Sequence, residues 1–228
     1  MCCMVRFKIL CRRALSGAVR LPVLLPTVLL ATALSATTAH AGAYDDFFKA
    51  LQLDLAQSVK TLLGRGFDPN TVDAANGDPG LVYAVRNESP NATLMLLTSP
   101  QINLEARARN GDTALMLAAY KEDVATVAAL LRKGAEPNRP GWTALHYAAA
   151  AGNSEIVQML LEKSAYIDAE SPNRTTPLMM AARNGKTSVV ELLIQRGADQ
   201  NVKNDQGMSA RDFAAKFADV TRELSEYP

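Results

Sequence analysis

The most obvious candidate for chemistry in this sequence is His146, which lies in the stretch GWTALHYAAAAGN at 141–153. A histidine titrates near neutral pH, so it can act as a general acid or base or bind a metal ion. Each of these roles needs a second group, such as a nucleophile, an acid or further metal ligands. No sequence motif places such a group beside His146. The alternative is that this histidine shapes a turn.

Residues 1–41 differ from the rest of the chain and have the pattern of a secretory signal peptide. They contain five basic and no acidic residues, and an apolar run leads to the small-residue site at 39–41. A basic head, an apolar middle and such a site predict cleavage, here before Gly42. The alternative is an uncleaved membrane anchor. The run fits that role less well, because it has about 18 residues, includes Pro22 and Pro26, and falls short of the roughly 20 apolar residues of a spanning helix.

Loss of this segment would change the chemistry available to the mature chain. Cys2, Cys3 and Cys11 would go with it, leaving no disulfide, thiol nucleophile or thiolate metal site. His40 would also go, and His146 would be the sole histidine. The mature chain has 19 basic and 23 acidic residues and a net charge of −4. An acidic chain without a basic block argues against nucleic acid and anionic lipid as partners.

The remaining sequence is an array of similar segments. Thr113, Thr143, Thr176 and Ser209 follow one another at spacings of 30, 33 and 33 residues, and each begins a short motif that ends in Ala-Ala. A second segment, LLRKGAEPN at 130–138, recurs in step as LLEKSAYID and LIQRGADQN. Fixed-period similarity of this kind indicates a repeat architecture. We expect six units, the last one truncated, with starts near residues 45, 79, 113, 143, 176 and 209.

Each unit carries the signals of two helices joined by a turn. Threonine and serine are good N-caps, because the hydroxyl accepts a hydrogen bond from a free amide of the first turn. Gly152 and Gly185 suit a left-handed turn after the first helix, and Gly134 and Gly197 suit one after the second. The Ala-Ala pairs keep one helix face small, so neighbouring helices can approach closely. One pair cannot bury its apolar face alone, and stacked pairs would form an all-α solenoid.

These segments resemble the ankyrin repeat, whose period is about 33 residues and whose signature is T-P-L-H-x-A. TALHYAAAAGN at 143–153 and TTPLMMAARNG at 175–185 carry the likeness, which extends over roughly residues 43–225. The resemblance implies an all-α ankyrin-repeat solenoid of about six helix-turn-helix repeats, including two caps, over residues 42–228. We expect this domain to be monomeric.

Two departures from the family pattern stand out. The loop at 138–141 is three residues short, so the finger between the third and fourth repeats should be stubby. Glu122 and Arg174 stand where glycine is usual.

The resemblance also places His146 at the histidine of the signature, where the side chain holds the turn by a hydrogen bond to the neighbouring loop. Equivalent places in other repeats hold Met116, Met179 and Arg211. A lone histidine supplies too few ligands for a zinc site. We therefore predict that the chain is not an enzyme and has no catalytic residue, metal site or cofactor.

In this family, partners usually dock on the loop tips and on the concave face formed by the first helices. Arginine, tryptophan and tyrosine are enriched among interface hot spots. At any single position the alternative is an ordinary solvated loop surface. The most favourable patch joins Trp142 and Arg139 with Arg107, Arg109 and Tyr120 one repeat earlier. The partner-binding candidates are Arg107, Arg109, Asp112, Tyr120, Arg139, Trp142, Arg174 and Arg183.

The sequence thus predicts a non-enzymatic scaffold that binds a protein partner and is exported to the periplasm or outside the cell. An alternative is an accessory subunit that supports an enzyme or cofactor protein in the cell envelope. A small-molecule binder is a third hypothesis, and it would need a closed pocket, which an open solenoid seldom offers.

Overall fold

The computed structural model describes residues 42–215 and residue 222. The predicted signal peptide at 1–41 and most of the C-terminal end of the predicted sixth repeat lie outside the described residues. The helices are residues 42–52, α2 (Ala56–Gly64), α3 (Gly80–Arg86), α4 (Pro90–Leu97), α5 (Ala114–Tyr120), α6 (Val124–Lys133), α7 (Ala144–Ala151), α8 (Ser154–Glu162), α9 (Pro177–Arg183), α10 (Thr187–Gln195) and α11 (Ala210–Ala214). Between 42 and 215 the only extended pairings are two isolated bridges.

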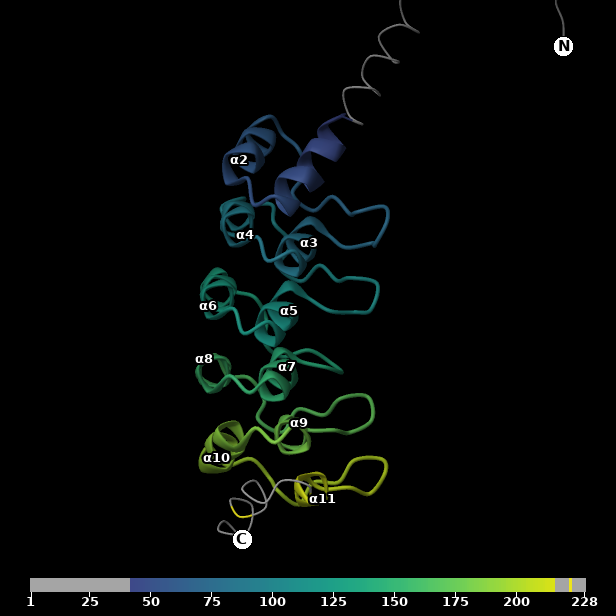
Figure 1. The fold of residues 1–228 in the computed structure, drawn as a ribbon, viewed down its shortest axis with the longest axis vertical. Coiled ribbons are helices and arrows are strands. Elements are labelled where there is room, and N and C mark those ends of the chain that lie inside the picture. Colours follow the sequence, from purple (N-terminus) through teal and green to yellow (C-terminus); the bar gives the residue numbers. More distant parts are fainter. Residues whose placement is uncertain (1–41, 216–221, 223–228) are drawn as a thin grey trace, which may run out of the picture. The chain divides into compact units, whose positions relative to one another are not determined.

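The helices form two columns, as Figure 1 shows. The first helices of the repeats, α3, α5, α7, α9 and α11, pack against one another in order, and so do the second helices, α2, α4, α6, α8 and α10. Each first helix also packs on the second helix of its own repeat where both are described. The prediction of an all-α solenoid is confirmed.

Alanine pairs make the close packing of the first helices possible. Ala118 and Ala119 of α5 and Ala148 and Ala149 of α7 are fully buried. Larger apolar residues such as Leu145 fill the space between the two columns and are equally buried. Small side chains on one face and leucine on the other let each repeat bury its apolar surface only against its neighbours.

The predicted N-caps lie directly before the helices that they begin. The hydroxyl of Thr113 accepts from the backbone N–H of Met116 at 3.3 Å. Thr143 and Ser209 each take part in a capping box, in which the side chain three residues later returns a bond to the cap. In the sixth repeat that side chain is Asp212. The assignment of Arg211 to the position of His146 is therefore wrong by one residue.

The turns after the helices take the left-handed conformation at the expected places. Gly152 and Gly134 have φ angles of 98° and 96°. Glu122 and Arg174, which stand where glycine is usual, both have φ of 59°. The repeat geometry thus imposes this conformation even where the residue carries a Cβ, against its usual steric preference.

Polar side chains also connect successive repeats in the loops that follow the second helices. A side-chain oxygen of Asn70 accepts from the backbone N–H of Asn103 at 2.7 Å. The same bond recurs in each following repeat, from Glu136 to Glu105 at 2.8 Å, from Tyr166 to Asn138 at 2.7 Å and from Asp199 to Asp168 at 3.1 Å. These bonds link each loop to the next one along the array.

Candidate functional site

His146 lies in α7 with no solvent-exposed surface, and its ring nitrogens both have partners. The backbone N–H of Thr143 donates to Nδ1 at 3.2 Å, so the proton of the neutral ring is on Nε2. Nε2 donates to the carbonyl oxygen of Thr175, in the loop before α9, at 2.8 Å. His146 therefore caps its own helix and fastens it to the next repeat, which confirms the interpretation as a turn-holding residue.

Burial lowers the pKa of His146 from 6.5 to about 4, and hydrogen bonds to the backbone of Thr175 and Ala169 offset only part of this effect. The ring is therefore neutral at pH 7. Its hydrogen-bonding positions are taken by Thr143 and Thr175, so it can neither receive a proton from a substrate nor bind a metal ion. The described residues contain no group of three or more histidine, cysteine or acidic side chains that could hold a metal.

Next to His146 lies a small pocket with an aromatic wall, which we call the aromatic pocket. Its volume is about 220 Å³. The ring centroids of Tyr120 and Tyr147 lie 6.1 Å apart at 90°, and those of Trp142 and His146 lie 5.3 Å apart at 77°. Both are edge-to-face arrangements, which aromatic rings favour. The pocket is lined by Tyr120, Trp142, His146, Tyr147, Ala150 and Met180, from α5, α7, α9 and the loop before α7.

Two predicted partner-binding residues meet in the aromatic pocket. Tyr120 is 58% exposed and Trp142 is 36% exposed. Trp142 follows the short loop, whose finger projects less far than its neighbours in Figure 1. In the two preceding repeats, Asp78 and Asp112 occupy the place of Trp142, directly before the cap residue.

Asp112 is not available to a partner, in contrast to the prediction. Its side chain is buried, and its carboxylate accepts from the hydroxyl of Tyr147 at 2.5 Å and from Nδ2 of Asn110 at 2.6 Å. Burial, together with the hydrogen bond to Asp112, raises the pKa of Tyr147. Asp112 therefore holds the hydroxyl of Tyr147, which lines the aromatic pocket, and does not form part of the surface.

The predicted arginines divide into paired and unpaired groups. Arg139 bonds to the carboxylate of Glu105 at 2.9 Å and retains 21% side-chain exposure, and Arg174 pairs with Glu170 at 3.2 Å. Arg107, Arg109 and Arg183 are exposed and make no ion pair with a described residue. Arg109 lies across Gly77 of the preceding loop. The structure thus brings Tyr120 and Trp142 together, and it does not gather all of the predicted arginines around them.

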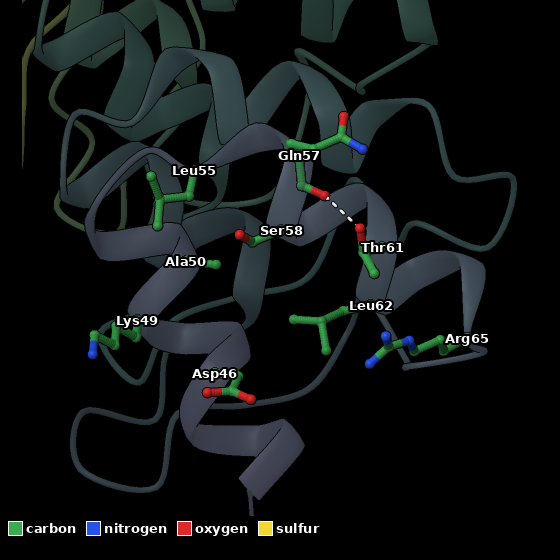
Figure 2. A pocket seen from close by; sticks show the side chains of 9 residues that line it. All are labelled: Asp46, Lys49, Ala50, Leu55, Gln57, Ser58, Thr61, Leu62 and Arg65. Atoms are coloured by element: carbon green, nitrogen blue, oxygen red, sulfur yellow. Dashed lines mark hydrogen bonds between the residues drawn. The ribbon is translucent and has the colours of Figure 1, made fainter.

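A second pocket lies in the first repeat, between the helix at 42–52 and α2 (Figure 2). Its volume is about 320 Å³. Figure 2 shows Asp46 and Lys49 on one wall and Arg65 on the other, without a common focus. The hydroxyl of Thr61 bonds to the carbonyl of Gln57 in its own helix at 2.9 Å. Nothing in this hollow converges on a ligand, so we assign it no function.

The part of the chain that the structure describes contains no helix of the length and apolarity needed to cross a bilayer.

Comparison with known proteins identifies the repeats. A family model described as ankyrin repeats, in three copies, matches residues 47–140, 81–172, 136–204 and 165–226. The crystal structure of the ankyrin repeat domain of Bcl-3 superimposes with a TM-score of 0.70 and 28% identity, over 78% of this chain and 81% of that domain.

Curated relatives share the repeats within much longer proteins. The E3 ubiquitin-protein ligase KEG of Arabidopsis thaliana is 38% identical over 49% of this chain, which spans 7% of the ligase. The human SH3 and multiple ankyrin repeat domains protein 2 is 29% identical over 73% of this chain, which spans 9% of that protein. The likeness therefore concerns the repeats and not the whole relatives.

Proposed function

Because this chain belongs to the ankyrin-repeat family over residues 47–226, we propose that it is a non-enzymatic scaffold that binds a protein partner through its loop tips and the exposed side of its first helices. The observation that carries the proposal is the exposure of Tyr120 and Trp142 at one pocket on that side. Arg107 and Arg109, in the loop before α5, are exposed and make no ion pair with a described residue. Aromatic and arginine side chains dominate the energetics of protein interfaces. The ligase activity of the Arabidopsis relative belongs to a protein of which this chain spans 7%, and we do not extend it to this chain.

Affinity capture tests this function. The full chain with a C-terminal tag is incubated with an extract of the producing cells, and bound proteins are identified at low and moderate salt. We expect one partner to be retained by the native chain and to be weakened by the double change Arg107→Glu and Arg109→Glu. The matched control is Arg132→Glu on α6, because this exposed arginine lies in the second-helix column. Failure to retain any partner at any salt would contradict the scaffold function.

We further propose that the scaffold acts in the periplasm or outside the cell. The support is the sequence of residues 1–41, with its basic head, apolar run and small-residue site before Gly42. N-terminal sequencing of the protein isolated from its native cells tests this location. A mature chain that begins at Gly42 is the expected result. An intact N-terminus recovered in the membrane fraction would favour the anchor instead.

A further inference from the structure

The aromatic pocket arises from a local change in the repeat pattern at Trp142. In the third repeat, the equivalent Asp112 accepts a hydrogen bond from Tyr147, which belongs to the following repeat. In the fourth repeat, Trp142 replaces this aspartate, and Met180 stands in the following repeat at the place that corresponds to Tyr147. Both Trp142 and Met180 line the aromatic pocket. A hydrogen-bonded pair in one repeat thus corresponds, in the next, to two side chains that offer apolar surface to a bound group.

The size of the pocket fits one large side chain. A dry apolar cavity of about 150 Å³ holds a benzene molecule. The aromatic pocket, at about 220 Å³, is large enough for a phenyl ring or a branched aliphatic side chain. Its exposed wall, Tyr120, is a rigid side chain that loses little conformational entropy on binding. The pocket is therefore suited to an anchor residue of a protein, and it is too small for a helix.

The charges around the pocket favour an acidic partner over a basic one. None of the lining residues is acidic, and the carboxylate of Asp112, which bonds to the lining residue Tyr147, is buried and already accepts two hydrogen bonds. Arg183 lies three residues after Met180 on α9, so the two side chains share one face of the helix. Arg183 is exposed and makes no ion pair with a described residue. A cation bound here would be repelled by Arg183.

The position that Arg183 occupies in the fifth repeat also holds an arginine in the second repeat. Tyr120, Ala150 and Arg183 are the eighth residues of their motifs, and Arg86 is the eighth residue of the motif that starts at Pro79. Arg86 is 40% exposed and pairs with the buried Asp78 at 2.6 Å. An arginine therefore stands beyond each end of the aromatic pocket along the first helices, and the one at the fifth repeat is free to bind an anion.

We propose that the aromatic pocket holds one aromatic or large aliphatic side chain of a protein partner, and that acidic residues flank this side chain in the partner's sequence. This inference rests on the scaffold function proposed above and specifies the partner's chemistry. The apolar side chain is buried among Tyr120, Trp142 and Met180. The flanking carboxylates reach Arg183, where a charge-assisted bond to guanidinium adds affinity and selects against basic segments.

Trp142 provides a direct reporter, because it is the only tryptophan of the chain. The probe is a capped peptide with a central phenylalanine and two glutamates on each side. Two matched peptides carry lysine flanks around phenylalanine, or glutamate flanks around alanine. We expect the first peptide to change the emission of Trp142 in a saturable manner in the full chain, and the other two to bind at least about tenfold more weakly.

Variants of the full chain separate the two parts of the site. Tyr120→Ala should lower the affinity for the glutamate–phenylalanine peptide roughly tenfold, because one wall of the pocket is lost. Arg183→Glu should reverse the preference between glutamate and lysine flanks. Both side chains are exposed, so folding should not depend on them. Tyr166→Ala, which alters a tyrosine 68% exposed outside the pocket, and Arg132→Glu are the matched controls and should leave binding unchanged.

The outcomes are distinct. Equal or tighter binding of the lysine peptide would overturn the acidic partner, and full affinity in Tyr120→Ala would overturn the pocket. Absence of a saturable emission change up to about 5 mM of the glutamate–phenylalanine peptide would overturn both. If a captured partner stays bound to Tyr120→Ala and to Arg183→Glu, the scaffold function stands and this pocket is not its site. If no partner is captured at all, the scaffold function itself fails.

Discussion

His146 stabilises the fold only while its ring is neutral, because Nδ1 accepts the backbone N–H of Thr143 and Nε2 donates to Thr175. Protonation would place a second N–H at Nδ1, opposite the N–H of Thr143, and would remove the acceptor of the cap. Burial already opposes the charged form and lowers the pKa to about 4. His146, which looks like a candidate for catalysis in the sequence, therefore stabilises the fold. Its protonation at low pH would remove this contribution.

The stability of the array should fall as the pH decreases from 6.5 toward 4. The unfolded chain, in which His146 has an ordinary pKa near 6.5, binds a proton in this range, and the folded chain does not until about pH 4. The folded state should lose about 2 kcal/mol between about pH 7.5 and pH 5 from this residue alone. Urea unfolding at the two pH values measures the loss.

The control for this effect is His146→Gln, which keeps an acceptor and a donor on the side chain and cannot titrate. The variant should be less stable at neutral pH and should show a smaller loss between the two pH values. An identical pH dependence in both proteins would mean that other groups cause it, such as carboxylates.

Tyr147 offers a second test at the level of a single atom. Tyr147→Phe removes the hydroxyl that donates to the buried carboxylate of Asp112. Loss of one donor to a buried acceptor should reduce the free energy of unfolding by about 1 to 3 kcal/mol. Tyr120→Phe removes a hydroxyl from a ring that is 58% exposed, and it should change stability by less than about 0.5 kcal/mol. Equal effects of the two substitutions in urea unfolding would contradict the role given to Asp112.

The sequence predicts roles within one repeat better than contacts between repeats. The in-phase copies are enough to place His146 at a turn and Thr143 at a cap. They do not indicate that Asp112 lies under Tyr147, because these residues are 35 positions apart and belong to different repeats. For the same reason the sequence does not indicate that Arg139, a partner-binding candidate, is paired with Glu105 of the preceding repeat. The exposed surface is fixed by pairings across the stack, which a pattern within one repeat does not contain.

Among the structural elements, the turns between helices were the most predictable. Glycine at 152, like Gly134, indicated a left-handed turn, because only glycine adopts this conformation without a steric cost. Glu122 and Arg174 adopt it as well, since the rest of the repeat determines the path of the chain. The bonds between loops, such as Tyr166 to Asn138, were not predicted, although the polar residue recurs in the sequence. The donors of these bonds are backbone N–H groups, which every residue except proline carries, so the residue types do not indicate them.

Gly152→Ala tests the turn after α7. Gly152 has φ of 98°, and an added Cβ would meet the side chain of Lys186 at 2.5 Å. We expect a loss of about 1 to 2 kcal/mol in the free energy of unfolding. Gly64→Ala is the matched control, because Gly64 ends α2 and an added Cβ would meet nothing within 4 Å. Alanine there should be neutral or stabilise by up to about 1 kcal/mol. Denaturant titration measures the free energy of unfolding of both variants. A loss in Gly64→Ala as large as in Gly152→Ala would rule out the turn as the cause.

Within residues 42–215, the main contacts of α2 to α11 are with helices of the same and the adjacent repeats. Stability in such an array is approximately a sum of repeat terms and nearest-neighbour interface terms. An end repeat has one neighbour and an inner repeat has two. A defect at the end can therefore be confined to the end by local unfolding, whereas the same defect in the middle weakens the connection between two halves.

Leu51→Ala and Leu145→Ala test this difference with the same chemical change. Both leucines have no exposed surface, one in the first repeat and one in the fourth. Each substitution removes the same buried atoms, at a local cost of about 2 to 5 kcal/mol. Native-state hydrogen exchange should show faster exchange in Leu51→Ala only around residues 42–64, with protection in α9 and α10 retained. In Leu145→Ala protection should fall on both sides of the fourth repeat. Equal loss of protection along the whole array in both variants would show that the repeats unfold as one unit, because interface terms would then outweigh the stability of any single repeat.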